Sequence, residues 1–164
     1  MIELKEASCS FSDGFGGKGL FTAVSPLSAH FSDGGRYAIV GESGSGKTTL
    51  ARMIAGLQRP SGGSVFVDGE PIYGRKRAGK EHFRKVQIIQ QNSASAMDPK
   101  IPVGKSIEEP LLCFFHMEKE KRRERCRNLM ELCNLSRDYY TRLPSELSGG
   151  EQKRVAIARA LAAE

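Results

Sequence analysis

The spacing of hydrophobic residues along the chain changes character near Ser106. Before that point, short apolar runs lie between clusters of Gly, Pro, Asp and Ser, a pattern that is typical of β-strands. The predicted strands span residues 2–11, 20–31 with a break at Pro26, 36–40, 64–67 and 86–89. Between them, the Lys- and Arg-rich stretch 74–85 is predicted to be a solvated surface loop.

After Ser106 the apolar residues recur at helical spacing. The predicted helices span residues 107–117, with Pro110 in the first turn, 118–133, a short turn at 135–142, and 155–163. One earlier helix is predicted at residues 49–55, directly after a glycine-rich loop. Strands mixed with helices in a chain of 164 residues predict one domain of the α/β class.

The glycine-rich loop at residues 41–49 reads GESGSGKTT and fits the phosphate-binding pattern G-x-x-x-x-G-K-[ST] at every specified position. Glycines let the backbone curl around a ligand, and the strand predicted before the loop and the helix after it are the context that the motif requires. Lys47 would reach the β- and γ-phosphates, and the hydroxyl of Thr48 would hold Mg²⁺. The candidate nucleotide-binding residues are Gly41, Ser43, Gly44, Ser45, Gly46, Lys47, Thr48 and Thr49. A flexible Gly/Ser loop without a ligand is the alternative.

A second glycine motif, Leu147-Ser148-Gly149-Gly150-Glu151, precedes the last predicted helix. Ser148 is placed as an N-cap, and Glu151 three residues later completes a capping box. A hydroxyl and close-approach N–H groups at the positive end of a helix form a second candidate anion site. A capped helix with no ligand remains the alternative.

Asp68 follows the apolar run 64–67, and such a run ending in Asp is also how a magnesium-binding Walker B strand looks. However, Asp68-Gly69 is among the strongest hairpin-turn dipeptides. The sequence therefore favours a hairpin here.

The formal charge of +6 is compatible with nucleic acid or a membrane surface as a partner. The basic residues occupy solvated stretches that are not interleaved with aromatics, so no nucleic-acid partner is expected. No apolar run approaches the ~18 residues of a membrane span, and the N-terminus carries no secretory signal. None of the four cysteines forms a C-x-x-C pair, so they are interpreted as reduced structural thiols.

Together, the two glycine motifs resemble those of ABC-transporter ATPases. Residues 147–151 are similar to the family's LSGGQ signature, with Glu151 in place of the usual Gln, and residues 41–49 are similar to its Walker A motif. Residues 86–92 resemble its Q-loop, with Gln91 at the glutamine position. Phe11 resembles the A-loop aromatic that stacks on adenine, and Phe15 is the second choice. Within the family, the amino-acid sequence is most similar to those of the oligopeptide, dipeptide and nickel importer ATPases.

The resemblance implies a P-loop NTPase (RecA-like) core with an N-terminal antiparallel β subdomain and a helical signature subdomain, incomplete at the C-terminus. The implied divisions are residues 1–92 for the β subdomain and P-loop core, 93–150 for the helical subdomain, and 151–164 for the return to the core. ATP and Mg²⁺ are the implied cofactors. Lys47 and Gln91 are the implied catalytic residues, and Thr48 and Gln91 the implied magnesium ligands. Phe11, Ser148, Gly149, Gly150 and Glu151 join the phosphate loop as nucleotide contacts.

The implied function is ATP binding and hydrolysis that drive import across a membrane. The implied partners are transmembrane permease subunits, a second ATPase subunit and, indirectly, a substrate-binding protein, at the cytoplasmic face of the cell membrane. In the family a Walker B strand follows the signature helix, whereas this sequence ends at Glu164. We therefore expect an N-terminal fragment without turnover of its own. A soluble ABC ATPase acting on DNA or the ribosome, and a catalytically silent nucleotide-binding fragment, remain open alternatives.

Overall fold

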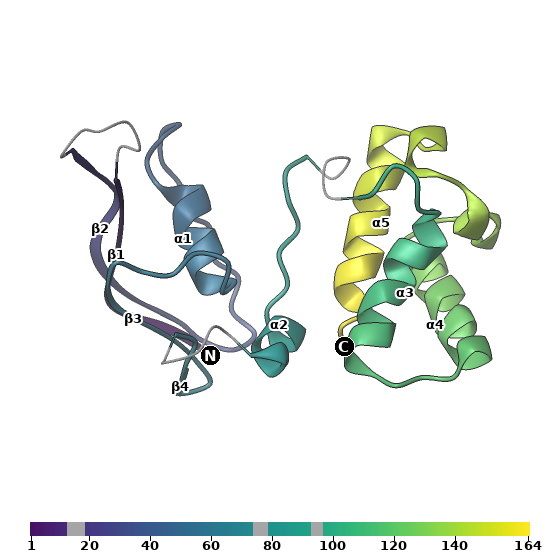
Figure 1. Ribbon diagram of the computed structural model, residues 1–164, viewed down its shortest axis with the longest axis horizontal. Helices are drawn as coiled ribbons and strands as arrows, with labels where there is room; N and C mark the ends of the chain where they lie inside the picture. The colour runs from purple at the N-terminus through teal and green to yellow at the C-terminus, as the bar shows by residue number, and fades with distance from the viewer. Residues whose placement is uncertain (13–18, 74–78, 93–96) are drawn as a thin grey trace. The chain divides into compact units, whose positions relative to one another are not determined.

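The computed structural model describes residues 1–12, 19–73, 79–92 and 97–164. The chain divides into two compact units, Met1–Val86 and Gln87–Glu164. The first unit is a sheet with a helix packed against it, and the second is a group of helices (Figure 1).

The first unit is built on an antiparallel sheet with the strand order β2-β1-β3-β4. The strands are β1 (Ile2–Ser12), β2 (Leu20–Phe31), β3 (Gly62–Val67) and β4 (Glu70–Pro71). Helix α1 (Lys47–Ile54) lies along the β1–β2 hairpin (Figure 1) and buries Leu50 and Met53 in one cluster with Leu4, Cys9 and Val24 of the strands. This apolar layer fixes α1, and the loop that precedes it, against the sheet.

The break predicted in the second strand is wrong, since β2 runs through Pro26 without interruption. Pro26 falls between the paired residues Val24 and Leu27, where the register shifts, and β2 is the edge strand of the described sheet. A proline is tolerated in an edge strand or at a bulge because no ladder hydrogen bond is required from its nitrogen.

The strands predicted at residues 36–40 and 86–89 are also wrong: neither segment is part of a strand. Most of their apolar side chains are exposed, with 91% of the surface of Val40 and 43% of that of Ile89 accessible to solvent. Among the residues that the structure describes, no strand pairs with either segment. A β-strand needs a neighbour for its backbone groups, so apolar character alone did not produce one.

The hairpin predicted at Asp68-Gly69 is confirmed. Both residues have positive φ, 52° and 80°, and Val67 pairs directly with Glu70 across a two-residue turn. Hydrogen bonds from Lys85 and from the N-terminal ammonium group lower the pKa of Asp68 to about 2. Asp68 therefore acts as a charged turn residue in the first unit.

A helix in the basic stretch and the start of α3 differ from the predictions. Helix α2 (Lys80–Lys85) replaces part of the predicted basic loop, and an ion pair of 2.9 Å between Glu81 and Arg84 spans one turn of it. Helix α3 (Val103–Phe114) begins earlier than predicted, so Pro110 lies inside the helix and not in its first turn. Val103 and Ile107, four residues apart and both buried, extend the apolar face of α3 toward its N-terminus.

The second unit packs α3 against α4 (Lys119–Leu132) and α5 (Gly149–Leu161). Short 3₁₀ turns, η2 (Arg137–Thr141) and η3 (Pro144–Glu146), connect α4 to α5. The shared core is apolar and includes Ile107, Met130 and Val155. Within the described residues, no helix has both the length and the apolar composition needed to cross a bilayer.

One carboxylate, that of Glu108, is fully buried in the second unit. It accepts hydrogen bonds from Tyr140 Oη at 2.6 Å, Lys105 Nζ at 3.0 Å and Arg122 Nε at 3.3 Å. Burial raises the pKa of Glu108, but these hydrogen bonds outweigh burial and hold the pKa below its ordinary value. The ionised side chain thus ties α3, α4 and η2 together.

Candidate functional site

The phosphate loop leads directly into α1. Gly44 and Gly46 have φ values of 85° and 87°, which side-chain-bearing residues rarely adopt, and Gly46 is the N-cap of the helix. The helical ladder starts with the bond of 2.9 Å from Leu50 N to Gly46 O, and no side chain caps the first turn. The N–H groups of the first turn have no acceptor within the helix, so this end of α1 can bind an anion.

The Lys47 side chain forms hydrogen bonds within the phosphate loop. Its ammonium group donates to Gly41 O at 2.8 Å, Glu42 O at 2.6 Å and Ser45 Oγ at 3.3 Å. The Ser45 N–H donates to Glu42 O at 3.2 Å and tightens the same turn. A positive charge and the N–H groups of a helix N-terminus therefore converge on a loop of a few residues.

Close packing surrounds two glycines of the loop, and at Gly46 the neighbour is backbone that cannot move aside. A Cβ added at Gly41 would lie 2.7 Å from Ser45 Oγ, and a Cβ added at Gly46 would collide with the carbonyl group of Ala23 in β2. The end of the loop is therefore held against the sheet by backbone contact at Gly46.

The two residues predicted to bind magnesium through an oxygen atom, Thr48 and Gln91, lie in different units. The hydroxyl of Thr48 is exposed at the start of α1, and the amide of Gln91 is exposed in the second unit. Both are hard oxygen ligands of the kind that Mg²⁺ accepts. Across the described ranges, no group of three or more His, Cys, Asp or Glu side chains could hold a metal ion.

Phe11, the residue predicted to stack on adenine, lies in β1 and is 40% exposed. Its partner across the ladder is Phe21 of β2, which is 58% exposed and was not singled out from the sequence. Only the strand register reveals that pairing. The second choice, Phe15, lies outside the described residues, as do Arg75, Lys76 and Arg77 of the basic stretch and residues 93–96.

The signature loop forms the capping box that the sequence predicts. Ser148 is the N-cap of α5, and its Oγ accepts from Glu151 N at 3.3 Å. Glu151 Oε2 in turn accepts from Ser148 N and from Ser148 Oγ, both at 2.7 Å. Ser148, Gly149 and Gly150 are exposed, and the preceding Leu147 is buried. The loop is thus anchored on one side and presents its polar groups on the other.

Glu151 also accepts a hydrogen bond of 3.1 Å from Tyr139 Oη, a contact that no sequence motif indicated. Hydrogen bonds from the hydroxyl and N–H of Ser148, and from Tyr139, hold the pKa of Glu151 below its ordinary value. The N-terminus of α5 therefore already carries a carboxylate, and the hydroxyl of Ser148 points its proton toward it.

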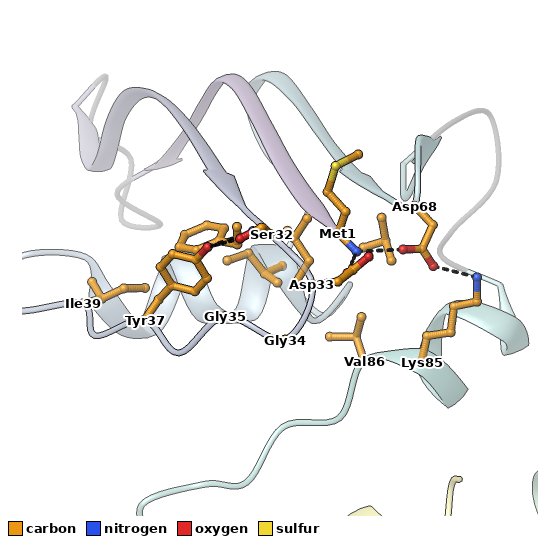
Figure 2. Close-up of a pocket in the computed structure, with 14 residues that line it drawn as sticks. Met1, Ser32, Asp33, Gly34, Gly35, Tyr37, Ile39, Asp68, Lys85 and Val86 are labelled. Atoms are coloured by element: carbon orange, nitrogen blue, oxygen red, sulfur yellow. Dashed lines mark hydrogen bonds and ion pairs between the residues drawn. The ribbon is translucent and has the colours of Figure 1, made fainter.

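A hollow of about 620 Å³ lies in the first unit, and Figure 2 shows the residues that line it. Its lining includes Tyr37, whose hydroxyl lies 2.6 Å from Ser32 Oγ, and Asp68, which pairs with Lys85 at 2.9 Å. No residue of the range 41–49 lines it. Its apolar walls include Ile39 and Val86, from the segments that failed to form strands.

Comparison with known proteins gives one consistent result. Residues 24–164 match the family described as ABC transporter. The chain is 38% identical over 164 residues to the oligopeptide transport ATP-binding protein OppF of Streptococcus pyogenes, with 98% of this chain and 52% of the relative covered. It is 39% identical over 142 residues to the nickel import ATP-binding protein NikE of Brucella suis, covering 86% of this chain and 53% of the relative.

Among solved structures, a dimeric ATP-binding cassette in a post-hydrolysis state with ADP and Pi matches with a TM-score of 0.86 at 28% identity. That match covers 99% of this chain and 69% of the other. The chain thus has the fold of these cassettes, which confirms the predicted fold class. It spans about half the length of the curated relatives that it matches, at 52% and 53%.

Proposed function

The chain belongs to the ABC transporter family, and from that premise we propose that it is the ATP-binding subunit of an importer. It would bind and hydrolyse ATP to drive uptake of a peptide, nickel or a similar small solute, as the names of its relatives suggest. The observation that carries the proposal is the phosphate loop, where no side chain caps the α1 N-terminus at Gly46 and the Lys47 ammonium group lies 2.8 Å from Gly41 O. That arrangement suits the polyphosphate of a nucleotide.

Each part of the loop has a distinct task in this proposal. The N–H groups of residues 41–49 surround the phosphates, and Lys47 moves from its carbonyl partners to the β- and γ-phosphate oxygens. Thr48 would contribute a hydroxyl oxygen to hold Mg²⁺, which would supply positive charge against the negative charge that develops on phosphate during transfer to water. Phe11 stacks on the adenine ring. The side-chain amide of Gln91 contacts the γ-phosphate and so senses whether it is bound.

Two copies, or this chain and a similar one, would enclose the nucleotides between them. Ser148 and Gly150 of one subunit contact the γ-phosphate held by Lys47 of the other. This role is supported by the exposure of the signature loop and by the dimeric state of the cassettes that the fold resembles. Closing and opening of such a pair converts the chemistry at phosphate into movement.

The movement would act on permease subunits in the membrane, with a substrate-binding protein as an indirect partner. The subunit would therefore lie at the cytoplasmic face of the membrane as a peripheral protein. The relatives named for oligopeptide transport and nickel import support this assembly and its class of cargo.

Replacement of Lys47 by Ala tests the proposal. Lys47→Ala removes the positive charge from the loop, and we expect the dissociation constant for ATP to rise about tenfold or more, because charge-assisted hydrogen bonds to phosphate are lost. Equilibrium dialysis with radiolabelled ATP measures the change.

Arg52→Ala is the matched control, since it removes one positive charge from the exposed side of the same helix. Its affinity for ATP should remain within about twofold of the original protein. Equal ATP affinity for Lys47→Ala and the original protein would reject the assignment of the loop.

A further inference from the structure

Two aromatic side chains are exposed side by side at the end of the β1–β2 hairpin. Phe11 and Phe21 are direct partners in the antiparallel ladder, and partners of this kind project from the same face of a sheet. Their neighbours Ser10 and Thr22 project from the other face, where their hydroxyl oxygens lie 3.2 Å apart. With 40% and 58% of their surfaces exposed, the two phenyl rings form an aromatic surface that the protein leaves open to solvent.

The aromatic pair lies on the face of the sheet that α1 covers. Side chains alternate along β1, so Phe11 shares its face with Cys9, two residues earlier. Cys9 and its partner Val24 are buried in one cluster with Leu50 and Met53 of α1. The two rings therefore extend the buried apolar layer of the sheet past the end of α1, where the helix no longer covers the strands.

The phosphate loop reaches this same part of β2. Gly46 approaches the carbonyl group of Ala23 so closely that a Cβ would not fit. Ala23 is the extra residue in the register shift between the pairs Cys9–Val24 and Ser10–Thr22, and it stands two residues from Phe21. Because a strand rises about 3.3 Å per residue, roughly 7 Å of strand separates this contact from Phe21. A nucleotide whose phosphates fill the loop therefore has an aromatic surface within reach of its base.

We propose that Phe21 contributes the second ring of the adenine-binding surface, so that the base stacks on Phe11 and Phe21 together. The inference rests on the proposed function, because it takes the phosphates to be bound in the loop. Stacking uses the π-face that every base has, so the pair adds affinity without selecting strongly between purines. The competing explanation is an aromatic pair that only stabilises the hairpin.

The decisive comparison is between a ligand with a base and a ligand without one. We expect Phe21→Ala to raise the dissociation constants for ATP and GTP roughly fivefold or more, while that for inorganic tripolyphosphate stays within about twofold. Phe21→Leu, which keeps an apolar side chain for folding but removes the aromatic face, should give the same loss. Equilibrium dialysis of the full 164-residue chain provides all of these constants.

Leu20→Ala is the matched control, since Leu20 is an exposed apolar neighbour that projects from the opposite face. It should leave ATP binding unchanged. The inference is overturned if Phe21→Leu binds ATP normally, or if ATP and tripolyphosphate weaken equally, because the second result would place the damage in the loop. Lys47→Ala, which should weaken both ligands, tests the proposed function separately from Phe21.

Discussion

The N-termini of α1 and α5 are built by opposite means. In α1 the backbone alone makes the site: Gly46 takes a φ of 87° and no side chain caps the first turn. In α5 the side chains of Ser148 and Glu151 cap the helix reciprocally, and the cap includes a carboxylate. The first end is thus open to an anion, whereas the second is internally satisfied. The capped start of α5 therefore leaves fewer free N–H groups for an anion than the start of α1.

The largest difference between the two ends should come from replacing a glycine at each. Gly46→Ala should reduce the free energy of unfolding by about 3 kcal/mol, because Ala is strained at positive φ and its Cβ meets the carbonyl group of Ala23. Gly149→Ala should change it by less than about 0.5 kcal/mol, because the space around Gly149 is open. Urea denaturation followed by circular dichroism measures both values.

Gly46→Ala should also lose ATP binding under conditions where it is still folded. Equal stabilities for the two alanine variants would show that backbone shape does not distinguish the two helix ends.

A second expected difference concerns the core of the second unit, where the buried Glu108 depends on side-chain hydrogen bonds. Glu108→Gln should lower the free energy of unfolding by about 2 kcal/mol, because it removes the charge that Lys105 and Arg122 face. The matched control is Glu109→Gln, since Glu109 is 59% exposed and pairs with Arg159 on the surface. A surface pair contributes little, so this control should lose less than about 1 kcal/mol.

Urea denaturation is again the measurement for the Glu108 pair. If the two glutamine variants have the same stability, the buried network is not what holds the second unit together.

A smaller effect is expected from removing one hydroxyl at each helix end. Ser148→Ala should lower the free energy of unfolding by about 1 kcal/mol through loss of the N-cap. Thr48→Ala should change stability by less than about 0.5 kcal/mol, because Thr48 is exposed and does not cap α1. Thermal melting of both variants measures the difference. A larger fall in melting temperature for Thr48→Ala than for Ser148→Ala would contradict the prediction.

The smallest expected effect depends on pH and concerns Glu151. In the folded protein its pKa lies below the ordinary value of 4.5, chiefly because of the Ser148 hydroxyl. The ionised carboxylate therefore stabilises the fold above that value, and this contribution is lost as the pH falls through the lowered pKa. The melting temperature should fall more steeply for the original protein than for Glu151→Gln between about pH 5 and pH 3. Parallel curves of melting temperature against pH for the two proteins would contradict this prediction.

Features made by neighbouring residues could be predicted from the sequence with good accuracy. The capping box needs only Ser148 and Glu151, three residues apart, and the hairpin needs only Asp68-Gly69; both are confirmed. The phosphate loop also follows from its own residues, because glycines at positions 44 and 46 allow the positive φ that the turn requires. Local covalent geometry and short hydrogen bonds decide all three.

Features that depend on distant partners could not be predicted. Residues 36–40 and 86–89 have the composition of buried strands, but a strand forms only when another segment pairs with it. Pro26 is tolerated because β2 is an edge strand with a register shift, a property of the assembled sheet. The pairing of Phe21 with Phe11 follows from the same register.

The sequence by itself determined the two glycine motifs and the family, because each motif is a run of neighbouring residues with fixed chemistry. Only the tertiary structure decided that Tyr139 donates a hydrogen bond to Glu151. It also decided that two phenyl rings share a face near the phosphate loop. The physical reason is distance along the chain: contacts between remote residues depend on how strands and helices pack, which no local pattern records.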